Sequence, residues 1–314
     1  MQNSNILADV DLKTRLAGTN RLELMLFELI DAQHTFSINV FKVREMLQCP
    51  PLTKPPGVHP SIVGVVHIRG HQFIPVIDLN KVLFNQYTEI DKYTILLITE
   101  YSQSIQGFLV NKADEIISFS WSDVYPPPES MGTDHYLTGV INFSEEKMVE
   151  IIDIERILAE IAPPVSTITK NKIDEGIKHK ACEFTVVMAD DSATAREITG
   201  EILKQIGVKV IAAKDGLEAL KILHERIRSK EMCEQYLLVT DEEMPEMDGY
   251  TLTRKCREDK VLSGLFIILN TSISGMFNEQ MVKSVGCDGF VPKTDPDLLS
   301  KLLIDRINEV CKDG

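Results

Sequence analysis

In the second half of the chain, short apolar runs end abruptly at polar residues. The run at 184–189 stops at Asp190, the run at 237–240 stops at Asp241, and two further runs lie at 266–269 and 289–292. Such runs are typical of strands that are buried on both faces of a parallel sheet. Helical patterns separate them, so we predict a doubly wound α/β fold, a five-stranded parallel sheet with helices on both faces. The helices are expected at 194–206, 216–231, 250–258, 275–284 and 296–311.

The first half has short segments in which apolar and polar residues alternate or β-branched residues dominate, a pattern that predicts strands. Turn signals separate the segments, for example Arg69-Gly70 and the Pro-rich stretch at 125–128. This half is therefore expected to be all-β and built from small β-barrels. The predicted strands are 22–29, 36–43, 62–68, 73–79, 93–99, 107–110 and 147–154.

An internal repeat supports two similar β subdomains. Residues 64–79 align without a gap with 139–154, which lie 75 positions later, and the apolar positions match throughout. Asp78 and Asp153 occupy matching positions, so capping of the next helix is favoured over chemistry for both. The first copy has Arg69-Gly70 at its hairpin tip, whereas the second has Ser-Glu-Glu. Residues that both copies share are the ones the fold needs, so a tip found in only one copy is a candidate for binding a partner. The ordinary alternative is that Arg69 is a solvent-exposed charge without a binding role.

A polar segment joins the two halves. Pro163-Pro164 ends a helical stretch, and 165–182 is Lys-rich and without an apolar period, which is typical of a linker. We therefore expect a first domain at 1–165, a linker at 166–182 and a second domain at 183–314.

Composition narrows the classes of partner and compartment. A chain of 314 residues with 44% hydrophobic content is long enough for about two domains. The formal net charge of −14 argues against nucleic acid as a partner. The longest apolar runs are far shorter than the roughly 20 residues that cross a bilayer, and the N-terminus lacks a signal-peptide pattern. The six cysteines show no metal or disulfide spacing. We expect a reduced, cytoplasmic protein that does not insert into a membrane.

The ends of the predicted parallel strands carry groups that could perform chemistry. Asp190, Asp191 and Asp241 would meet Thr271 and Lys293 at one edge of the sheet. Three clustered carboxylates repel one another unless a cation lies among them, and a small hard cation with oxygen ligands fits best. Magnesium is the expected occupant. Taken alone, the two adjacent aspartates could instead cap the following helix.

From about residue 184 onwards the chain resembles a response-regulator receiver domain. The matching motifs are Asp190-Asp191, Asp241 followed by Met244-Pro245 and Met247-Asp248-Gly249, Thr271-Ser272, and Gly289-Phe290-Val291-Pro292-Lys293. The resemblance implies that Asp241 accepts a phosphoryl group. It also implies that Asp190, Asp191, Asp241 and the backbone carbonyl of Glu243 hold magnesium.

Further roles follow from the same resemblance. Thr271 and Lys293 would bind the phosphoryl oxygens, and Phe290 would be the aromatic residue whose rotamer reports phosphorylation. Phenylalanine is commonly a core residue, so an ordinary core aromatic is as good an interpretation of Phe290 as a switch. The chain departs from the usual pattern at Thr294, where Pro is common, and Glu242-Glu243 adds negative charge beside the acceptor.

About 22–158 resembles a CheW-type chemotaxis coupling domain. The matching motifs are Phe41-Lys42-Val43-Arg44-Glu45-Met46, Val63-Gly64-Val65, Ile68-Arg69-Gly70 and Ile74-Pro75-Val76-Ile77-Asp78-Leu79. That family has paired five-stranded barrels without a catalytic centre. With the receiver, the whole chain resembles the CheV family of chemotaxis coupling proteins. The resemblance implies two partners, chemoreceptors and a CheA-type histidine kinase, and a place in receptor arrays at the inner membrane.

Three other functions are compatible with parts of this pattern. The receiver could act as a phosphate sink that drains phosphoryl groups from the kinase. A metal-dependent phosphatase is disfavoured because Asp241 is followed by Glu242-Glu243 and not by a second Asp placed as a general acid. A transcription factor is disfavoured because no DNA-binding module follows the receiver pattern. We therefore expect an adaptor that accepts a phosphoryl group on itself and is not an enzyme.

Overall fold

The computed structural model describes most of the chain as two compact units, divided between residues 163 and 164. The described residues are 21–30, 34–68, 73–101, 104–132, 135–144, 147–162, 167–169, 173, 175–228, 235–271 and 286–312. The predicted partner-binding residues Arg69 and Gly70 and the helix predicted at 275–284 lie outside these ranges. None of the described helices has the length and apolar character needed to cross a membrane.

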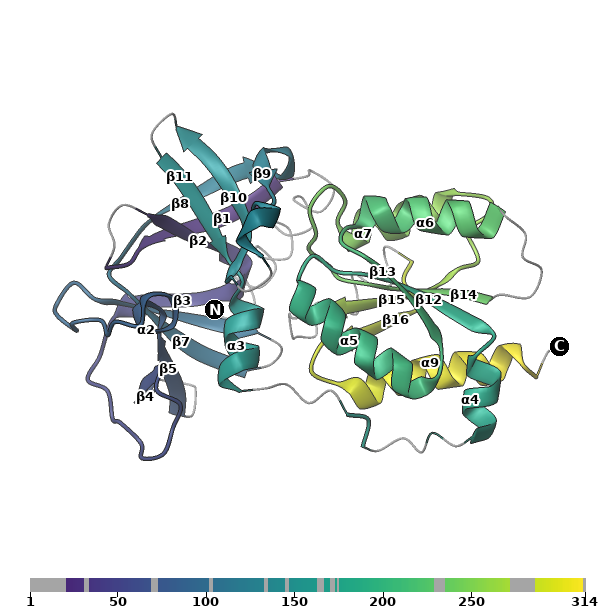
Figure 1. Ribbon diagram of the computed structural model, residues 1–314, viewed down its shortest axis with the longest axis horizontal. Helices are drawn as coiled ribbons and strands as arrows, with labels where there is room; N and C mark the ends of the chain where they lie inside the picture. The colour runs from purple at the N-terminus through teal and green to yellow at the C-terminus, as the bar shows by residue number, and fades with distance from the viewer. Residues whose placement is uncertain are drawn as a thin grey trace, which may run out of the picture. The chain divides into compact units, whose positions relative to one another are not determined.

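The C-terminal unit contains the predicted five-stranded parallel sheet, in the order β13-β12-β14-β15-β16. Its strands are β12 (Phe184–Ala189), β13 (Lys209–Ala213), β14 (Gln235–Thr240), β15 (Phe266–Thr271) and β16 (Gly289–Pro292). Its described helices include α5 (Ala193–Ile206), α6 (Gly216–Arg228), α7 (Gly249–Glu258) and α9 (Pro296–Val310). Helices α5 and α9 cover one face, and α6 and α7 cover the other (Figure 1). The α/β prediction is confirmed.

The apolar runs form strands because helices bury both of their faces. All six residues of β12 are buried. Val186 and Met188 belong to the core beneath α5 and α9, whereas Val187 and Ala189 belong to the core on the opposite face. Alternate side chains of a strand point to opposite faces, so a continuous apolar run is what a doubly covered strand requires.

The N-terminal unit is all-β, as predicted, and consists of two sheets. The first has the order β8-β1-β2-β11-β10-β9 and the second has the order β3-β6-β7-β5-β4. The strands are β1 (Arg21–Glu28), β2 (Thr35–Asn39), β3 (Val43–Gln48), β4 (Ile62–His67), β5 (Phe73–Asp78), β6 (Ile95–Tyr101), β7 (Ser104–Val110), β8 (Lys112–Ser120), β9 (Val124–Tyr125), β10 (Leu137–Ser144) and β11 (Lys147–Ile152). One core cluster joins the sheets, with Phe27 and Phe36 from the first and Leu97 and Phe108 from the second.

The internal repeat corresponds to a repeated strand–strand–helix unit. The first copy is β4, β5 and α2 (Leu79–Phe84), and the second is β10, β11 and α3 (Ile154–Ile161). Gly64 and Gly139 occupy matching positions in the two copies. A Cβ atom would lie 2.8 Å from a neighbouring side-chain carbon at Gly64 and 2.5 Å from one at Gly139, so a larger residue would be too close at both positions. Asp78 and Asp153 are the N-caps of α2 and α3, which confirms their predicted structural role.

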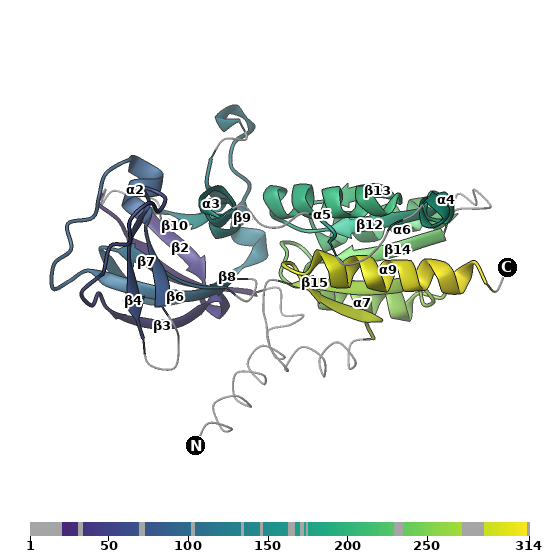
Figure 2. The same ribbon diagram turned by 90° about the horizontal axis from the view of Figure 1, so that it is seen from below.

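Part of the segment predicted as a linker is folded against the C-terminal unit. Residues Glu175–Ala181 form α4, which lies beside α9 (Figures 1 and 2). Ile168, Ile173 and Ile177 pack against the same core that α5 and α9 cover. These apolar residues are separated by several polar ones, so each contact is made without an evident apolar period in the sequence.

Candidate functional site

The strand order brings the predicted site residues to one edge of the parallel sheet. Ala189 and Thr240 pair at the ends of β12 and β14, so the residues that follow them, Asp190 and Asp241, are neighbours. The backbone N–H of Asp241 donates to the carbonyl of Ala189 across 2.7 Å. At the ends of β15 and β16, the N–H of Lys293 donates to the carbonyl of Thr271 across 2.8 Å. Parallel pairing therefore places groups from four strands at the same edge.

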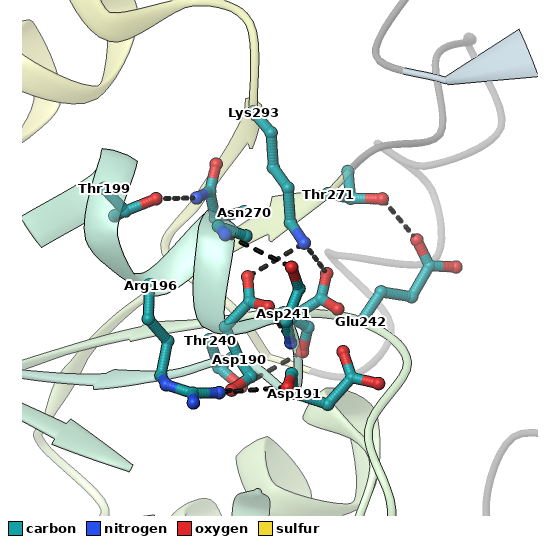
Figure 3. A network of polar contacts seen from close by, with 12 residues as sticks. Asp190, Asp191, Arg196, Thr199, Thr240, Asp241, Glu242, Asn270, Thr271 and Lys293 are labelled. Atoms are coloured by element: carbon teal, nitrogen blue, oxygen red, sulfur yellow. Dashed lines mark hydrogen bonds and ion pairs between the residues drawn. The ribbon is translucent and has the colours of Figure 1, made fainter. Parts of the chain in front are cut away.

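Three carboxylates and one ammonium group meet at this edge (Figure 3). One carboxylate oxygen from each of Asp190, Asp191 and Asp241 lies within 4.8 Å of the others. The Nζ atom of Lys293 lies 2.8 Å from Oδ2 of Asp190 and 3.3 Å from Oδ1 of Asp241. The side chains of Lys293, Asp190 and Asp241 are 9%, 4% and 8% exposed, so water screens these charges weakly.

The charge balance of the cluster fits a bound divalent cation. Three carboxylates face one ammonium group, which leaves unbalanced negative charge at a largely buried site. Oxygen atoms spaced within 4.8 Å of one another suit a small hard cation such as Mg²⁺, which prefers carboxylate ligands and keeps several water molecules. Asp190, Asp191 and Asp241 fit that role, and Glu243, the fourth predicted ligand, follows two residues after Asp241 in a half-buried position.

The loop after β12 is fixed by contacts that leave the aspartate side chains directed at the cluster. The N-cap of α5 is Ser192, whose side chain accepts from the N–H of Ala195. The guanidinium of Arg196 donates to the backbone carbonyls of Asp190 and Asp191 across 2.7 Å and 3.0 Å (Figure 3). The two aspartates therefore do not serve as the helix cap, which was the alternative interpretation of this pair.

Gly249 keeps the loop after Asp241 close to the sheet. A Cβ atom at this position would lie 2.0 Å from the backbone carbonyl oxygen of Asp241. The N–H of Gly249 donates to the carbonyl of Glu242 across 3.0 Å, and Asp248 caps α7 by accepting from the N–H of Thr251. The Asp-Gly pair thus both starts the helix and allows the close approach.

Thr271 lies at the end of β15, and its hydroxyl forms a hydrogen bond with Glu242, a residue that was not predicted to belong to the site. Its Oγ1 donates to Oε2 of Glu242 across 2.6 Å, and Glu242 is only 7% exposed (Figure 3). The sequence indicated only that Glu242 adds charge beside Asp241. No spacing rule pairs it with Thr271, since the contact depends on how the loop after β14 turns.

Phe290 lies on β16, half-buried, in a small cluster with Tyr250, Leu269 and Cys287. Tyr250 is the second residue of α7 and is 7% exposed. Burial, and next the negative charge of Glu242, raise the pKa of the Tyr250 phenol well above its ordinary value of 10.0. The cluster therefore connects the predicted switch aromatic to a buried hydroxyl close to Glu242.

Comparison with known proteins agrees with both halves of this description. Residues 23–162 match the CheW-like domain family, and residues 186–304 match the response regulator receiver domain family. The chemotaxis protein CheW of Bacillus subtilis is 30% identical over 138 residues, covering 43% of this chain and 86% of the relative.

Some relatives align with both domains at once. The chemotaxis protein CheV1 of Helicobacter pylori is 28% identical over 313 residues, covering 95% of this chain and 97% of the relative. CheV3 of the same organism is 30% identical over 299 residues, covering 88% of this chain and 94% of the relative. Since these alignments run through the all-β unit and the carboxylate site in the same order, the chain belongs to the CheV family of chemotaxis proteins, with a CheW-like domain followed by a response regulator receiver domain.

Proposed function

We propose that this chain, a chemotaxis coupling adaptor by family, links chemoreceptors to a CheA-type histidine kinase and that phosphorylation of Asp241 modulates the link. The CheW-like domain would bind both partners, with Arg69 and Gly70 at its partner-binding tip. The receiver domain would accept the phosphoryl group. In this role the protein is cytoplasmic, associates with receptor arrays at the inner membrane, and is not an enzyme.

The observation that carries the proposal is the placement of Asp241 between Lys293 and two further carboxylates. In the proposed reaction a carboxylate oxygen of Asp241 attacks the phosphorus of a phosphohistidine on the kinase. A P–O bond forms while the P–N bond breaks, and the leaving imidazole takes up a proton. Such a transfer depends mainly on positioning and on positive charge, because negative charge is spread over the phosphoryl oxygens.

The chain's own residues supply part of that charge and position the reacting groups. The Lys293 ammonium, 3.3 Å from Asp241, is placed to pair with an arriving phosphoryl oxygen. Thr271 lies one strand away and offers a hydroxyl that can donate to another. Mg²⁺, held by Asp190, Asp191, Asp241 and the carbonyl of Glu243, would supply the remaining positive charge. Movement of Thr271 towards the phosphoryl group would change the space available to Phe290, a two-state response.

The test measures transfer of labelled phosphate from the phosphorylated kinase to the full chain in the presence of Mg²⁺. We expect an acid-stable, base-labile label on the wild-type protein and none on Asp241→Asn. The matched control is Asp305→Asn, which removes the same group from an exposed position on α9 and should label normally. Equal labelling of Asp241→Asn and the wild type would contradict the proposal.

The rate of label loss and the effect of Arg69→Ala distinguish this function from that of a phosphate sink. A sink loses its phosphate rapidly and gains nothing from receptor coupling. An adaptor controlled by phosphorylation keeps the label long enough to alter the receptor–kinase complex. Arg69→Ala should then reduce receptor-dependent kinase activity while leaving labelling of Asp241 unchanged. Full receptor coupling in Arg69→Ala together with fast label loss would favour the sink.

A further inference from the structure

Glu242 is a buried carboxylate whose hydrogen-bond donor is the hydroxyl that the proposed phosphoryl chemistry needs. It follows Asp241 directly, is 7% exposed, and accepts from Oγ1 of Thr271 across 2.6 Å. Figure 3 shows Thr271 and Glu242 facing each other, to one side of the cluster formed by Asp190, Asp191 and Asp241. The proposed function gives Glu242 no part in the reaction, so its burial needs a separate reason.

A hydroxyl has one proton and donates to one strong acceptor at a time. When Thr271 donates to a phosphoryl oxygen on Asp241, its hydrogen bond to Glu242 must break. A buried carboxylate that loses its donor is unfavourable unless it leaves the interior or finds another donor. The next donor for Glu242 must therefore lie close to its present position.

Tyr250 supplies a suitable donor. Its hydroxyl is buried and makes no hydrogen bond in the described part of the chain. Glu242 raises the pKa of this phenol through its charge and through side-chain hydrogen bonding, so the two groups are neighbours, but the strict distance and angle criteria for a hydrogen bond are not met and the Tyr250 hydroxyl remains unsatisfied. A buried hydroxyl without a partner is uncommon and calls for an explanation. A second position of the Glu242 carboxylate would satisfy it.

We propose that Glu242 holds the Thr271 hydroxyl until a phosphoryl group on Asp241 takes it, and that Glu242 then accepts from the Tyr250 hydroxyl instead. This inference rests on the proposed phosphorylation of Asp241. It makes Glu242 a positioning residue, because it acts through Thr271 and Tyr250. Because the Tyr250 ring packs in one cluster with Leu269 and Phe290, the exchange of partners also reaches the aromatic switch position.

The exchange predicts that Tyr250 matters only in the phosphorylated form and only when Glu242 is present. The probe is beryllofluoride with Mg²⁺, which mimics a phosphoryl group on an aspartate, titrated into the full chain and followed by calorimetry. In the wild-type background, Tyr250→Phe should weaken binding about tenfold, the order expected for losing one hydrogen bond to a charged group. With Leu at position 242, the same change should alter binding by less than about twofold.

Three further variants make this comparison of Tyr250→Phe in two backgrounds specific. Glu242→Met keeps the length of the side chain but offers no acceptor oxygen, so it replaces Glu242→Leu if that variant folds poorly. Glu246→Gln removes the same charge from an exposed position in the same loop and should bind like the wild type. Asp241→Asn should abolish binding. A ¹³Cζ-tyrosine resonance assigned to Tyr250 should shift on adding beryllofluoride to the wild type and stay in place in the Glu242 variants.

The outcomes separate this inference from the proposed function. If the wild type binds beryllofluoride and Asp241→Asn does not, phosphoryl acceptance stands. The partner exchange is then overturned if Tyr250→Phe has no effect, or has the same effect in both backgrounds. If wild type and Asp241→Asn both fail to bind, the proposed function and the partner exchange fail together.

Discussion

Lys293 and Asp190 form an ion pair of 2.8 Å in which both side chains are less than one-tenth exposed. An ammonium group in this position offsets part of the charge of three clustered carboxylates. Removal of one partner of a buried pair is costly because it leaves the other charge uncompensated. This relationship makes Lys293 a stabilising residue of the receiver as well as a proposed phosphoryl-binding one.

Lys293→Met should therefore lower the free energy of unfolding of the receiver by about 3 kcal/mol without Mg²⁺. Mg²⁺ should restore part of this loss, because a bound cation replaces the missing positive charge. Urea unfolding with and without Mg²⁺ measures both values. Lys301→Met, which removes an exposed lysine of α9, is the matched control and should change stability by less than about 0.5 kcal/mol. Wild-type stability of Lys293→Met in the absence of Mg²⁺ would contradict the role given to the ion pair.

Gly249→Ala should disable the site without touching any of its functional groups. The new Cβ atom would lie 2.0 Å from the carbonyl oxygen of Asp241, so the loop must move and Asp241 must move with it. We expect phosphoryl transfer to fall at least about a hundredfold, since small displacements of reacting groups have effects of this order. Gly264→Ala is the control, because a Cβ atom there meets nothing within 4 Å. The measurement is label transfer to both variants, with their thermal unfolding recorded to show that each is folded. Equal labelling of Gly249→Ala and Gly264→Ala would show that the close approach is unimportant.

Alkaline pH should destabilise the receiver through Cys256. Burial raises the pKa of this thiol from its ordinary value of 9.0 to about 12. Since the folded state holds the proton more tightly than the unfolded state, the contribution is fully present below pH 9 and decreases as pH rises towards about 12. The loss is roughly 1.4 kcal/mol per pH unit for one such group. Urea unfolding between pH 8 and pH 10.5 should therefore show a shallower decline in Cys256→Ala than in the wild type, whereas Cys182→Ala, at an exposed thiol, should not change the slope.

The fold and the cluster of charges were predictable because both follow from strand burial. A doubly covered strand such as β12 needs a continuous apolar run, and parallel strands end at one edge, so Asp190 and Asp241 had to be neighbours once the sheet was recognised. The repeat likewise fixed the capping roles of Asp78 and Asp153, because their surroundings occur twice.

The features that escaped prediction depend on side-chain contacts without a periodic signal. Strand β8 has a mixed polar and apolar sequence, and α4 lies in a Lys-rich segment that contacts the core through a few isoleucines. The bond between Thr271 and Glu242 joins residues 29 positions apart in the sequence and depends on the turn after β14. Neither hydrophobic period nor motif spacing carries this kind of information.

The two N-cap aspartates of the repeat should differ sharply in their contribution to stability. Asp78 is fully buried and accepts from the N–H groups of Asn80, Lys81 and Thr88 and from the Thr88 hydroxyl, at 2.7–3.3 Å. Asp153 accepts from the N–H of Arg156 across 2.9 Å and is half-buried. Asp78→Ala leaves several buried donors without an acceptor, so we expect a loss of about 3 kcal/mol or more. Asp153→Ala removes an ordinary cap and should cost about 1 kcal/mol.

Thermal unfolding of the full chain measures both aspartate variants, and each serves as the control for the other because the two positions match in the repeat. Phosphoryl transfer to Asp241 should be unchanged in both, since the substitutions lie in the CheW-like domain and the acceptor lies in the receiver domain. Equal losses of stability would mean that capping of the helix is the whole role of Asp78. A larger loss for Asp78→Ala would show that its buried hydrogen bonds to Thr88 tie the segment after α2 to the core, which is a task that the second copy of the repeat does not assign to Asp153.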